Sequence, residues 1–360
     1  MHHVKNAPFG LNGRGASSPD PENSFMQTQT PAGRDYTLNR IAVLDDYQGY
    51  AMEMADWSAV KGRAEVVVFR QHLSDDEAAI ALADFDAICC IRERMALPAS
   101  LLRRLPRLRF IGVTGVVHRT LDMDCAKAQG ILVSNTNRRG SGAFATAELA
   151  WGMILSLARN LPSEMTGMKR GGWQTSCGIS IGGRTLGVLG LGRLGSHMVP
   201  VARAFGMNVI AWSQNLTPEN AAAAGARWVD KDTLFREADF LSLHVVLSHR
   251  TRHIVGAHEL ALMKPTAYIV NTARGPLIDR DALIEAVKHK RIAGVALDTF
   301  DVEPLPEDDA LRTLDNVWLT PHLGYTVREL LVPFYEDTVE NLLAYMDGKP
   351  VRLLSGGESH

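Results

Sequence analysis

Three side chains suited to anion binding and proton transfer follow apolar, strand-like segments in the last third of the sequence. Arg274 ends the strand-like part of "YIVNTARGPLID" (268–279), while Glu303 and His322 lie in "ALDTFDVEP" and "LTPHLG". A guanidinium matches a carboxylate bidentately, an imidazole can give or take a proton near neutral pH, and a neighbouring carboxylate favours the imidazolium form. Together they suit hydride transfer to a 2-oxo acid. Arg274 would bind the carboxylate and polarise the carbonyl, and His322, supported by Glu303, would protonate the developing alkoxide.

A glycine cluster earlier in the chain would bind the nucleotide cofactor that such chemistry needs. In "TLGVLGLGRLGSHM", Gly190, Gly192 and Gly195 form the pattern G-x-G-x-x-G after an apolar strand-like segment and before a helical one. In this pattern the first glycine makes a tight turn, the second lets a pyrophosphate approach the backbone, and the third allows close packing of helix on strand. The amides of Arg193 and Leu194 would face the phosphates. The pattern alone is weak, but its position between strand and helix favours dinucleotide binding.

The end of the next strand-like segment bears on the choice of cofactor. NAD-binding folds usually carry an acidic residue there, which binds the ribose 2′-hydroxyl, but "NVIAWS" ends in Ser213, followed by Gln214 and Asn215. The missing carboxylate permits a 2′-phosphate, yet no arginine stands beside Ser213 to attract one. NAD and NADP both remain open, with a slight preference for NADP.

Further cofactor contacts are expected at other strand ends. Thr272 and Ala273 precede Arg274 directly, and Gly324 follows His322 by two positions. Asp298, at the end of the strand-like "GVAL", could accept a hydrogen bond from the nicotinamide carboxamide and so fix which ring face is presented. These residues belong together because open α/β sheets bind ligands at the carboxyl ends of their strands.

The elements that must position these residues alternate between strand and helix. Residues 1–36 are rich in Pro, Gly, Asn and Ser, and we expect a disordered tail. Apolar strands then alternate with helices, in two series, which predicts two parallel sheets covered on both faces. The five strands of the first series are "RIAVLDD", "EVVVFR", "AICCIR", "RFIGVT" and "ILVSNT"; the seven of the second are "TLGVLGLG", "NVIAWS", "ARWV", "DFLSLHV", "AYIVNTA", "AGVALDTF" and "NVWLTPH".

Two helices determine the domain organisation. The segment 143–161 is apolar nearly all round and should be a helix that is buried or at an interface. The last helix, expected over 332–346, follows a complete second sheet and is expected to return to the first domain. We therefore predict an α/β protein with a discontinuous substrate domain (37–137 and 323–352) and a nucleotide-binding domain (138–322).

Composition narrows the possible partners. With 360 residues, 46% hydrophobic and 22% charged, the chain is long enough for two domains with real cores. A net charge of -2 and a pI of about 6.6 argue against nucleic acid or an anionic membrane as a partner. Four cysteines, two of them adjacent in "AICCI", suggest reduced thiols in a cytoplasmic protein. Neither a long apolar run nor an apolar N-terminal signal core is found in the sequence.

The motifs, in this order and at these intervals, resemble those of the D-2-hydroxyacid dehydrogenases, over about residues 40 to 350. They are "LGVLGLGRLG", "NTARGPLID", "ALDTFDVEP" and "TPHLG". The resemblance implies two Rossmann-like domains, a flavodoxin-like substrate domain and a dinucleotide-binding domain, with the active site in the cleft between them. It implies Arg274, Glu303 and His322 as the catalytic set and Asp298 as the nicotinamide partner. It also implies a homodimer through the cofactor domain, with the helix at 143–161 in the interface.

The substrate loop departs from the pattern of that family. Family members usually carry a glycine-rich loop whose amides bind the substrate carboxylate, and the corresponding stretch here is "TGVVHRTLD" (114–122). The amides of Val116 and Val117 could still bind the carboxylate. His118 and Arg119 would make the pocket differ from that of the commonest members. Arg92 or Arg94, in "IRERM", would either face the cleft or lie at a solvated strand end.

Several alternatives are weighed against this interpretation. His249 and His253 are spaced i, i+4, but neighbouring arginines and the lack of a Cys or carboxylate partner disfavour a metal site, so we expect none. The same fold and side chains serve cofactor-sensing corepressors, so a protein-binding module is the alternative function. A formate dehydrogenase is disfavoured because Thr320 and Pro321 directly precede His322. A phosphoglycerate dehydrogenase with a regulatory tail is not expected, because the sequence ends soon after the last helix.

Overall fold

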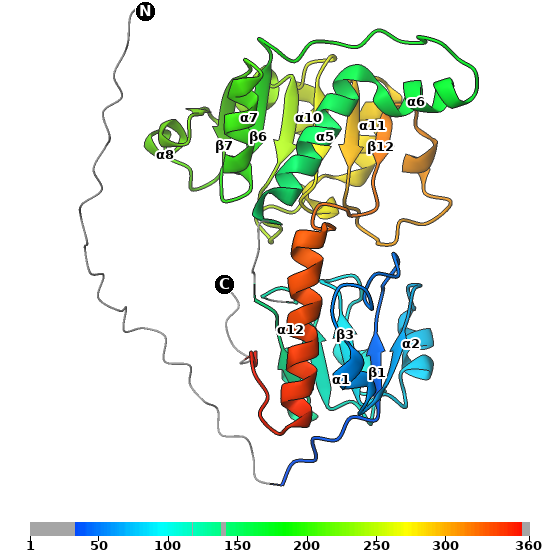
Figure 1. The fold of residues 1–360 in the computed structure, drawn as a ribbon. Helices are drawn as coiled ribbons and strands as arrows, with labels where there is room; N and C mark the ends of the chain where they lie inside the picture. The colour runs from blue at the N-terminus through cyan, green and yellow to red at the C-terminus, as the bar shows by residue number, and fades with distance from the viewer. Residues whose placement is uncertain (1–32, 117, 138–141, 355–360) are drawn as a thin grey trace, which may run out of the picture. The chain divides into compact units, whose positions relative to one another are not determined.

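The computed structural model of the protein describes residues 33–116, 118–137 and 142–354, coloured along the chain in Figure 1. The tail expected over residues 1–36 lies almost wholly outside these ranges. The chain divides into two units, residues 1–37 and residues 38–360, and every element described below belongs to the second. No helix in the described ranges is long and apolar enough to cross a membrane.

The first sheet, as far as the chain is described, has five parallel strands in the order β2-β1-β3-β4-β5. This is the flavodoxin-like strand order. The strands are β1 (Arg40–Val43), β2 (Glu65–Val68), β3 (Ala87–Cys90), β4 (Phe110–Val113) and β5 (Leu132–Ser134). Strands β3 and β4 are buried at every position, which explains why their sequences are continuously apolar rather than alternating. All five predicted strands are confirmed.

Short helices connect these strands. They are α1 (Ser58–Lys61), α2 (Asp75–Ala81), α3 (Ala99–Leu102) and α4 (Met123–Ala128). Ser74 begins α2 with a capping box, in which its hydroxyl accepts from the Glu77 amide while the Glu77 carboxylate accepts from the Ser74 amide. The Asp122 carboxylate caps α4 through the Cys125 amide.

The second sheet has seven parallel strands among the described residues, in the order β12-β11-β10-β9-β6-β7-β8. The order reverses beside β6, which pairs with β7 on one side and β9 on the other, as in dinucleotide-binding folds. The strands are β6 (Thr185–Leu189), β7 (Asn208–Trp212), β8 (Arg227–Trp228), β9 (Phe240–Leu243), β10 (Tyr268–Asn271), β11 (Gly294–Leu297) and β12 (Val317–Leu319). All seven predicted strands are present.

Helices cover the second sheet, and short 3-10 turns lie at several strand ends. The helices are α5 (Ala145–Arg159), α6 (Leu161–Lys169), α7 (Met198–Ala204), α8 (Pro218–Ala223), α9 (Lys231–Glu237), α10 (Ala257–Leu262) and α11 (Arg280–Lys288); the 3-10 turns are η1 (Gly142–Phe144), η2 (Gly195–His197), η3 (Gly275–Leu277) and η4 (Ala310–Thr313). Helix α5 packs across β10 and β11 (Figure 1).

The helix expected over 143–161 is shorter than predicted. Asn160 adopts a left-handed conformation, φ 52°, which ends α5 at Arg159 and separates it from α6. Asparagine tolerates this conformation better than most residues and often occupies it at helix ends. Apolar periodicity alone could not reveal that stop.

The last helix, α12 (Arg328–Met346), starts four residues earlier than expected and contains Pro333. Leu331 and Phe334 are buried on either side of that proline, so packing extends the helix past the point where the sequence suggested a start. The helix packs against β4 and α1 although it follows β12 in sequence (Figure 1). It therefore brings residues that follow the loop after β12 back to the first sheet.

Candidate active site

Arg274 lies just beyond the carboxyl end of β10, where its conformation is held by its neighbours. The buried Asn271 side chain donates to the Arg274 carbonyl at 2.9 Å and accepts from the Ala273 amide at 3.0 Å. Gly275 permits a close approach to the turn after β11, since a Cβ there would lie 2.2 Å from the Phe300 carbonyl carbon. The two turns that carry Arg274 and Glu303 are thereby brought together.

His322 and Glu303 form a tight pair. Nδ1 of His322 lies 2.6 Å from Oε2 of Glu303, whose Oε1 accepts from the Phe300 amide at 2.9 Å. An ionised carboxylate only accepts hydrogen bonds, so Nδ1 carries the hydrogen and Nε2 is the nitrogen left for a substrate. His322 has φ 53°, an uncommon conformation for a residue that is not glycine, so the backbone is held in a strained conformation at this position.

Asp298 organises the loop that carries His322. It is buried, and its carboxylate accepts from the Thr320 hydroxyl at 2.5 Å and from the Leu323 and Gly324 amides at 2.7 and 2.9 Å. Burial raises the pKa of this carboxyl, against the opposing effect of those hydrogen bonds. The role expected for Asp298 as a nicotinamide partner stays a prediction, while its hold on the loop is observed.

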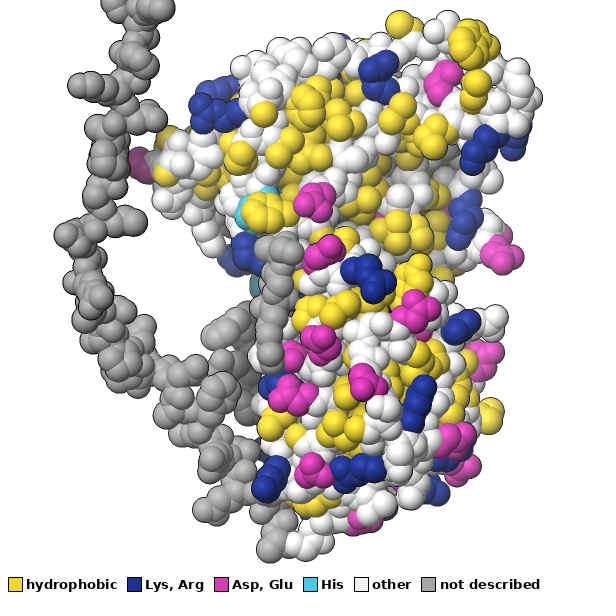
Figure 2. Space-filling view, in the orientation of Figure 1, with side chains coloured by type: hydrophobic (Ala, Val, Ile, Leu, Met, Phe, Trp, Pro, Cys, Tyr) yellow, Lys and Arg dark blue, Asp and Glu magenta, His cyan; other side chains and the backbone are white. Residues whose placement is uncertain are grey.

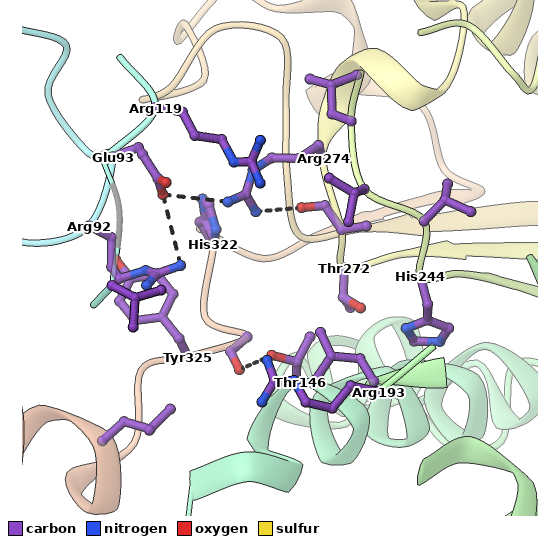
Figure 3. A pocket seen from close by; sticks show the side chains of 18 of the residues that line it. Arg92, Glu93, Arg119, Thr146, Arg193, His244, Thr272, Arg274, His322 and Tyr325 are labelled. Atoms are coloured by element: carbon purple, nitrogen blue, oxygen red, sulfur yellow. Dashed lines mark hydrogen bonds and ion pairs between the residues drawn. The ribbon is translucent and has the colours of Figure 1, made fainter. Parts of the chain in front are cut away.

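The loops that carry Arg274 and His322 line a cavity of about 510 Å³ (Figure 3). Most of its lining residues follow β3 and β4 of the first sheet and β6, β9, β10 and β12 of the second, and the others lie on η1, α5 and α12. The cavity therefore lies at the carboxyl ends of strands from both sheets, where α/β folds bind ligands. Both Arg274 and His322 line it. So do Thr272, Ala273, Gly324 and Thr146, whose hydroxyl donates to the Gly324 carbonyl at 2.8 Å.

The glycine cluster has the geometry that a dinucleotide requires. Gly190 has φ 100°, a conformation that glycine adopts without steric cost. A Cβ at Gly195 would lie 2.0 Å from the Gly190 carbonyl oxygen, so the chain is tightly packed there, whereas the space beside Gly192 is open within 4 Å. Arg193 and Leu194 line the cavity directly after this turn. The chain continues into the 3-10 turn η2 and then α7, so the regular helix starts later than the sequence pattern suggested.

Other predicted residues lie at different distances from the cavity. Ser213 follows β7 and is not among the described residues that line it. Val116 lines the cavity, while Val117 lies outside the described residues. Arg119 lines the cavity as well, but His118 is buried away from it, and burial lowers the pKa of this imidazole. Of the two residues expected to change the substrate pocket, only Arg119 lines the cavity, and its effect on the substrate stays a prediction.

Of the two arginines after β3, Arg92 lines the cavity, whereas Arg94 forms a hydrogen bond to Tyr325, which lines it. Nε of Arg94 donates to the Tyr325 hydroxyl at 2.7 Å, and its Nη1 donates to the Asp45 carbonyl at 2.5 Å. The ring of Tyr325 stands edge-on to the His322 imidazole, with 5.4 Å between the ring centroids. Arg94 thus joins the end of β1 to the loop that carries His322 and Tyr325.

Three ionisable lining residues were missed from the sequence. Glu93 approaches Nη2 of Arg274 at 3.4 Å with its Oε2 atom (Figure 3), and Tyr325 forms part of the wall. His244 lines the cavity beyond β9, where burial lowers the pKa of this imidazole to about 4, so it is neutral at physiological pH. All three lie at or just after strand-like segments of the sequence, and this position is the signal that could have identified them.

The structure gives no support for a metal centre at His249 and His253. No group of three or more His, Cys, Asp or Glu side chains that could hold a metal ion occurs in the described ranges. His253 instead donates its backbone amide to the Pro276 carbonyl at 2.9 Å.

Comparison with known proteins gives a consistent picture. The family model described as "D-isomer specific 2-hydroxyacid dehydrogenase, NAD binding domain" matches residues 151–324. The chain is 41% identical over 260 residues to a D-3-phosphoglycerate dehydrogenase of Methanocaldococcus jannaschii, covering 71% of this chain and 49% of the relative. It is 38% identical over 258 residues to a glyoxylate reductase of Thermococcus litoralis, covering 69% of this chain and 77% of the relative.

A solved structure matches over nearly the whole described fold. The phosphoglycerate oxidoreductase from Vibrio cholerae o395 superposes with a TM-score of 0.81 at 33% identity, covering 86% of this chain and 99% of the other. The match spans about half the length of the phosphoglycerate dehydrogenases of Methanocaldococcus and Synechocystis, 49% and 56%.

Proposed function

Because the chain belongs to the D-2-hydroxyacid dehydrogenase family, we propose that it is an oxidoreductase that uses a nicotinamide cofactor to reduce a 2-oxo acid reversibly to its D-2-hydroxy acid. The observation that carries this proposal is the cavity itself. It is lined by the Arg274 guanidinium, by the His322 imidazole paired with Glu303 at 2.6 Å, and by the turn after Gly192. A carboxylate anchor, a proton donor and a cofactor loop therefore face one space.

The mechanism follows from what each side chain can do. Arg274 binds the substrate carboxylate with its planar fork and polarises the neighbouring carbonyl. Glu303 holds Nδ1 of His322, so Nε2 is directed to the substrate and donates its proton to the carbonyl oxygen as that oxygen becomes an alkoxide. Asp298 fixes the loop on which His322 lies. In the reverse direction Nε2 accepts the proton from the hydroxyl group. The bound nicotinamide would supply or accept the hydride.

The cofactor that fits this site is NAD or NADP. The open space at Gly192 suits a pyrophosphate near the amides of Arg193 and Leu194. Thr272, Ala273 and Gly324 line the same cavity, and we assign them to the nicotinamide end. We favour NADP slightly, because the residues after β7 are Ser213, Gln214 and Asn215, and no carboxylate among them would repel a 2′-phosphate.

The test of this proposal is the decay of reduced-nicotinamide absorbance, with NADH and NADPH in parallel. The substrates would be glyoxylate, pyruvate, hydroxypyruvate and phenylpyruvate, together with oxaloacetate and 3-phosphohydroxypyruvate. Turnover of any of them supports the proposed reaction, and the ratio of kcat/KM with the two cofactors decides the NADP preference. If no member of the panel is reduced while cofactor binding is measurable, the proposed reaction is wrong.

Glu303→Gln should shift the pH range over which the enzyme reduces its substrate. In the proposed reduction His322 gives a proton to the substrate, and the Glu303 carboxylate lies 2.6 Å from the other nitrogen of its ring. Glutamine keeps a hydrogen bond but removes the charge, so we expect reduction to be lost at lower pH than in the wild type, while the optimum for oxidation also moves down. The measurement is kcat/KM against pH in both directions. Superimposable profiles of variant and wild type would remove Glu303 from this role.

A cofactor-sensing protein-binding module was the alternative expected from the sequence. The relatives described above and the hydroxypyruvate reductase of Thermotoga maritima, 38% identical over 272 residues, are all named as enzymes. No observation on the cavity favours the binding module over the enzyme, so we do not propose it. We place the protein in the cytoplasm because all four cysteines are free.

We also propose the domain division and the homodimer expected from the sequence. The packing of α12 on β4 supports a substrate domain of residues 37–137 and 323–352 and a cofactor domain of 138–322. Hydrophobic side chains gather on the face where α5 lies (Figure 2). Between residues 142 and 205, the large hydrophobic side chains with an exposed fraction of 41% or more are Phe144, Leu161, Met165, Met168, Trp173 and Phe205. Exposed apolar side chains in such number are typical of protein interfaces, which supports dimerisation through the cofactor domain.

Charging this surface should separate the dimer. We expect Met165→Glu combined with Met168→Glu to reduce the mass in solution from twice the chain mass of 39.4 kDa to the chain mass itself, because two carboxylates would be desolvated in each half of the interface. Light scattering after size exclusion measures this directly. Ile80→Glu, at a residue 79% exposed on α2, is the matched control and should leave the mass unchanged. A double variant that stays dimeric would show that the interface lies elsewhere.

A further inference from the structure

Arg92 is a largely buried cation whose guanidinium N–H groups donate no hydrogen bond to another described residue. Its side chain is 20% exposed, and its guanidinium makes no hydrogen bond within the described residues. The Glu93 carboxylate lies 4.0 Å away, and the centre of the Tyr325 ring lies 5.9 Å away. A guanidinium carries five N–H donors, and a charge withdrawn from water needs a partner to offset the cost. Glu93 offsets part of this cost as a long ion pair at 4.0 Å, and the donors line the cavity, where an anionic ligand would supply the hydrogen bonds that Glu93 does not.

The backbone around Arg92 is shaped to place this side chain. Arg92 has φ 55°, and its amide donates to the Thr114 hydroxyl at 2.7 Å. Gly115 has φ 86°, and a Cβ there would lie 2.1 Å from Nη1 of Arg92. Any side chain at position 115 would therefore displace the guanidinium. The uncommon conformation of Arg92 and the absence of a side chain at Gly115, on two different loops, accommodate one arginine, which indicates a built binding position rather than a solvated strand end.

The charges on the substrate side of the cavity exceed what a simple 2-oxo acid can neutralise. Among the described lining residues, Arg92, Arg119 and Arg274 face a single carboxylate there, Glu93. One oxygen of Glu93, Oε2, approaches both Arg274 and Arg92, at 3.4 and 4.0 Å. In the proposed reduction His322 carries the proton that it donates, so its charge offsets that of Glu303, and Arg193 lies at the turn assigned to the cofactor phosphates. A surplus of two positive charges remains, whereas the carboxylate of a 2-oxo acid brings one negative charge.

We propose that the substrate is a 2-oxo acid with a second anionic group, a carboxylate or a phosphate, and that Arg92 and Arg119 bind this group. The inference rests on the proposed reaction, in which Arg274 binds the first carboxylate. Arg119 follows β4, extends toward the same space as Arg274 (Figure 3), and has no hydrogen bond or ion pair to another described residue. Two guanidiniums with free donors form charge-assisted hydrogen bonds to either kind of anion.

The experiment compares substrates that differ by one anionic group. Pyruvate and oxaloacetate differ by a carboxylate, and hydroxypyruvate and 3-phosphohydroxypyruvate differ by a phosphate. We expect the doubly anionic member of at least one pair to have the higher kcat/KM, by about 10-fold or more, since a hydrogen bond to a charged group contributes on that order. The pair that shows the difference identifies whether the second anion is a carboxylate or a phosphate.

Arg92→Met tests the assigned residue, because methionine keeps much of the apolar stem and removes the charge. We expect KM for the preferred doubly anionic substrate to rise about 10- to 100-fold, with kcat/KM for its singly charged counterpart changed by less than about threefold. The unchanged singly charged substrate also shows that the variant is folded. Arg104→Met, at an exposed arginine paired with Asp76, is the matched control and should behave as the wild type with both substrates.

The outcomes separate this inference from the proposed reaction. If singly charged 2-oxo acids are reduced at least as well as their doubly charged counterparts, the second-anion site is wrong and the reaction stands. Equal losses on both members of a pair in Arg92→Met would also overturn the assignment of Arg92. If no 2-oxo acid of either kind is reduced, the proposed reaction fails and this inference fails with it.

Discussion

His322→Asn should lower kcat for 2-oxo acid reduction by about 10²- to 10⁴-fold, which is the contribution typical of a positioned general acid. Asparagine suits this test for two reasons. It tolerates the left-handed backbone conformation that His322 adopts at φ 53°, so the loop should persist. Its amide can still donate to Glu303, so the carboxylate keeps a partner, but it offers the substrate no titratable proton.

The kinetic pattern distinguishes loss of chemistry from loss of binding. Because Arg274 remains in place, KM should change little while kcat falls. The measurement is steady-state reduction kinetics together with the dissociation constant of the reduced cofactor, which should stay within about threefold of the wild-type value. A variant that keeps kcat within about threefold of the wild type would exclude His322 as the proton donor.

Arg274→Ala should also lower kcat/KM strongly, but through KM as well as kcat. The guanidinium binds the substrate carboxylate in the ground state and polarises the carbonyl in the transition state, so KM should rise sharply while kcat falls. The loss of kcat/KM is expected to be about 10²- to 10³-fold, as for removal of one preorganised donor. Arg274→Lys should recover only part of this loss, because a single ammonium cannot reproduce the bidentate fork.

The matched control for Arg274 is an arginine outside the cavity. Arg236 pairs with Asp232 on α9, and Arg236→Ala should leave kcat and KM unchanged. The substitution of Arg274 also removes a partner of Glu93, so thermal unfolding of both variants should be recorded beside the kinetics. Wild-type kinetics in Arg274→Ala would refute the assignment of the carboxylate anchor.

The predicted sheets, and the convergence of Arg274 and His322 on one cavity, were recoverable from the sequence because both depend on local pattern. Strands buried on both faces are continuously apolar, and in a parallel sheet the residues that follow them meet at one edge. Arg274, Asp298 and His322 each follow such a strand, which is why their convergence could be expected before the structure was known.

The features that escaped prediction depend on tertiary geometry. Glu93 lies next to Arg274 through packing of loops from different sheets, 181 residues apart in sequence, and neighbouring sequence does not reveal such a contact. The left-handed conformations of Arg92 and His322 also escaped, because neither residue type favours them. The early start of α12 reflects burial of Leu331 and Phe334, which outweighs the helix-breaking tendency of Pro333.

The most direct test follows the hydride itself. The purified protein would be given a reduced nicotinamide carrying deuterium at the transferred position, with the 2-oxo acid that it reduces best, and the product would be analysed for label and configuration. We expect a D-2-hydroxy acid with deuterium on C2. A product without deuterium on C2 would contradict direct hydride transfer to a 2-oxo acid held by Arg274 and protonated by His322, and an L-configured product would contradict the proposed D configuration.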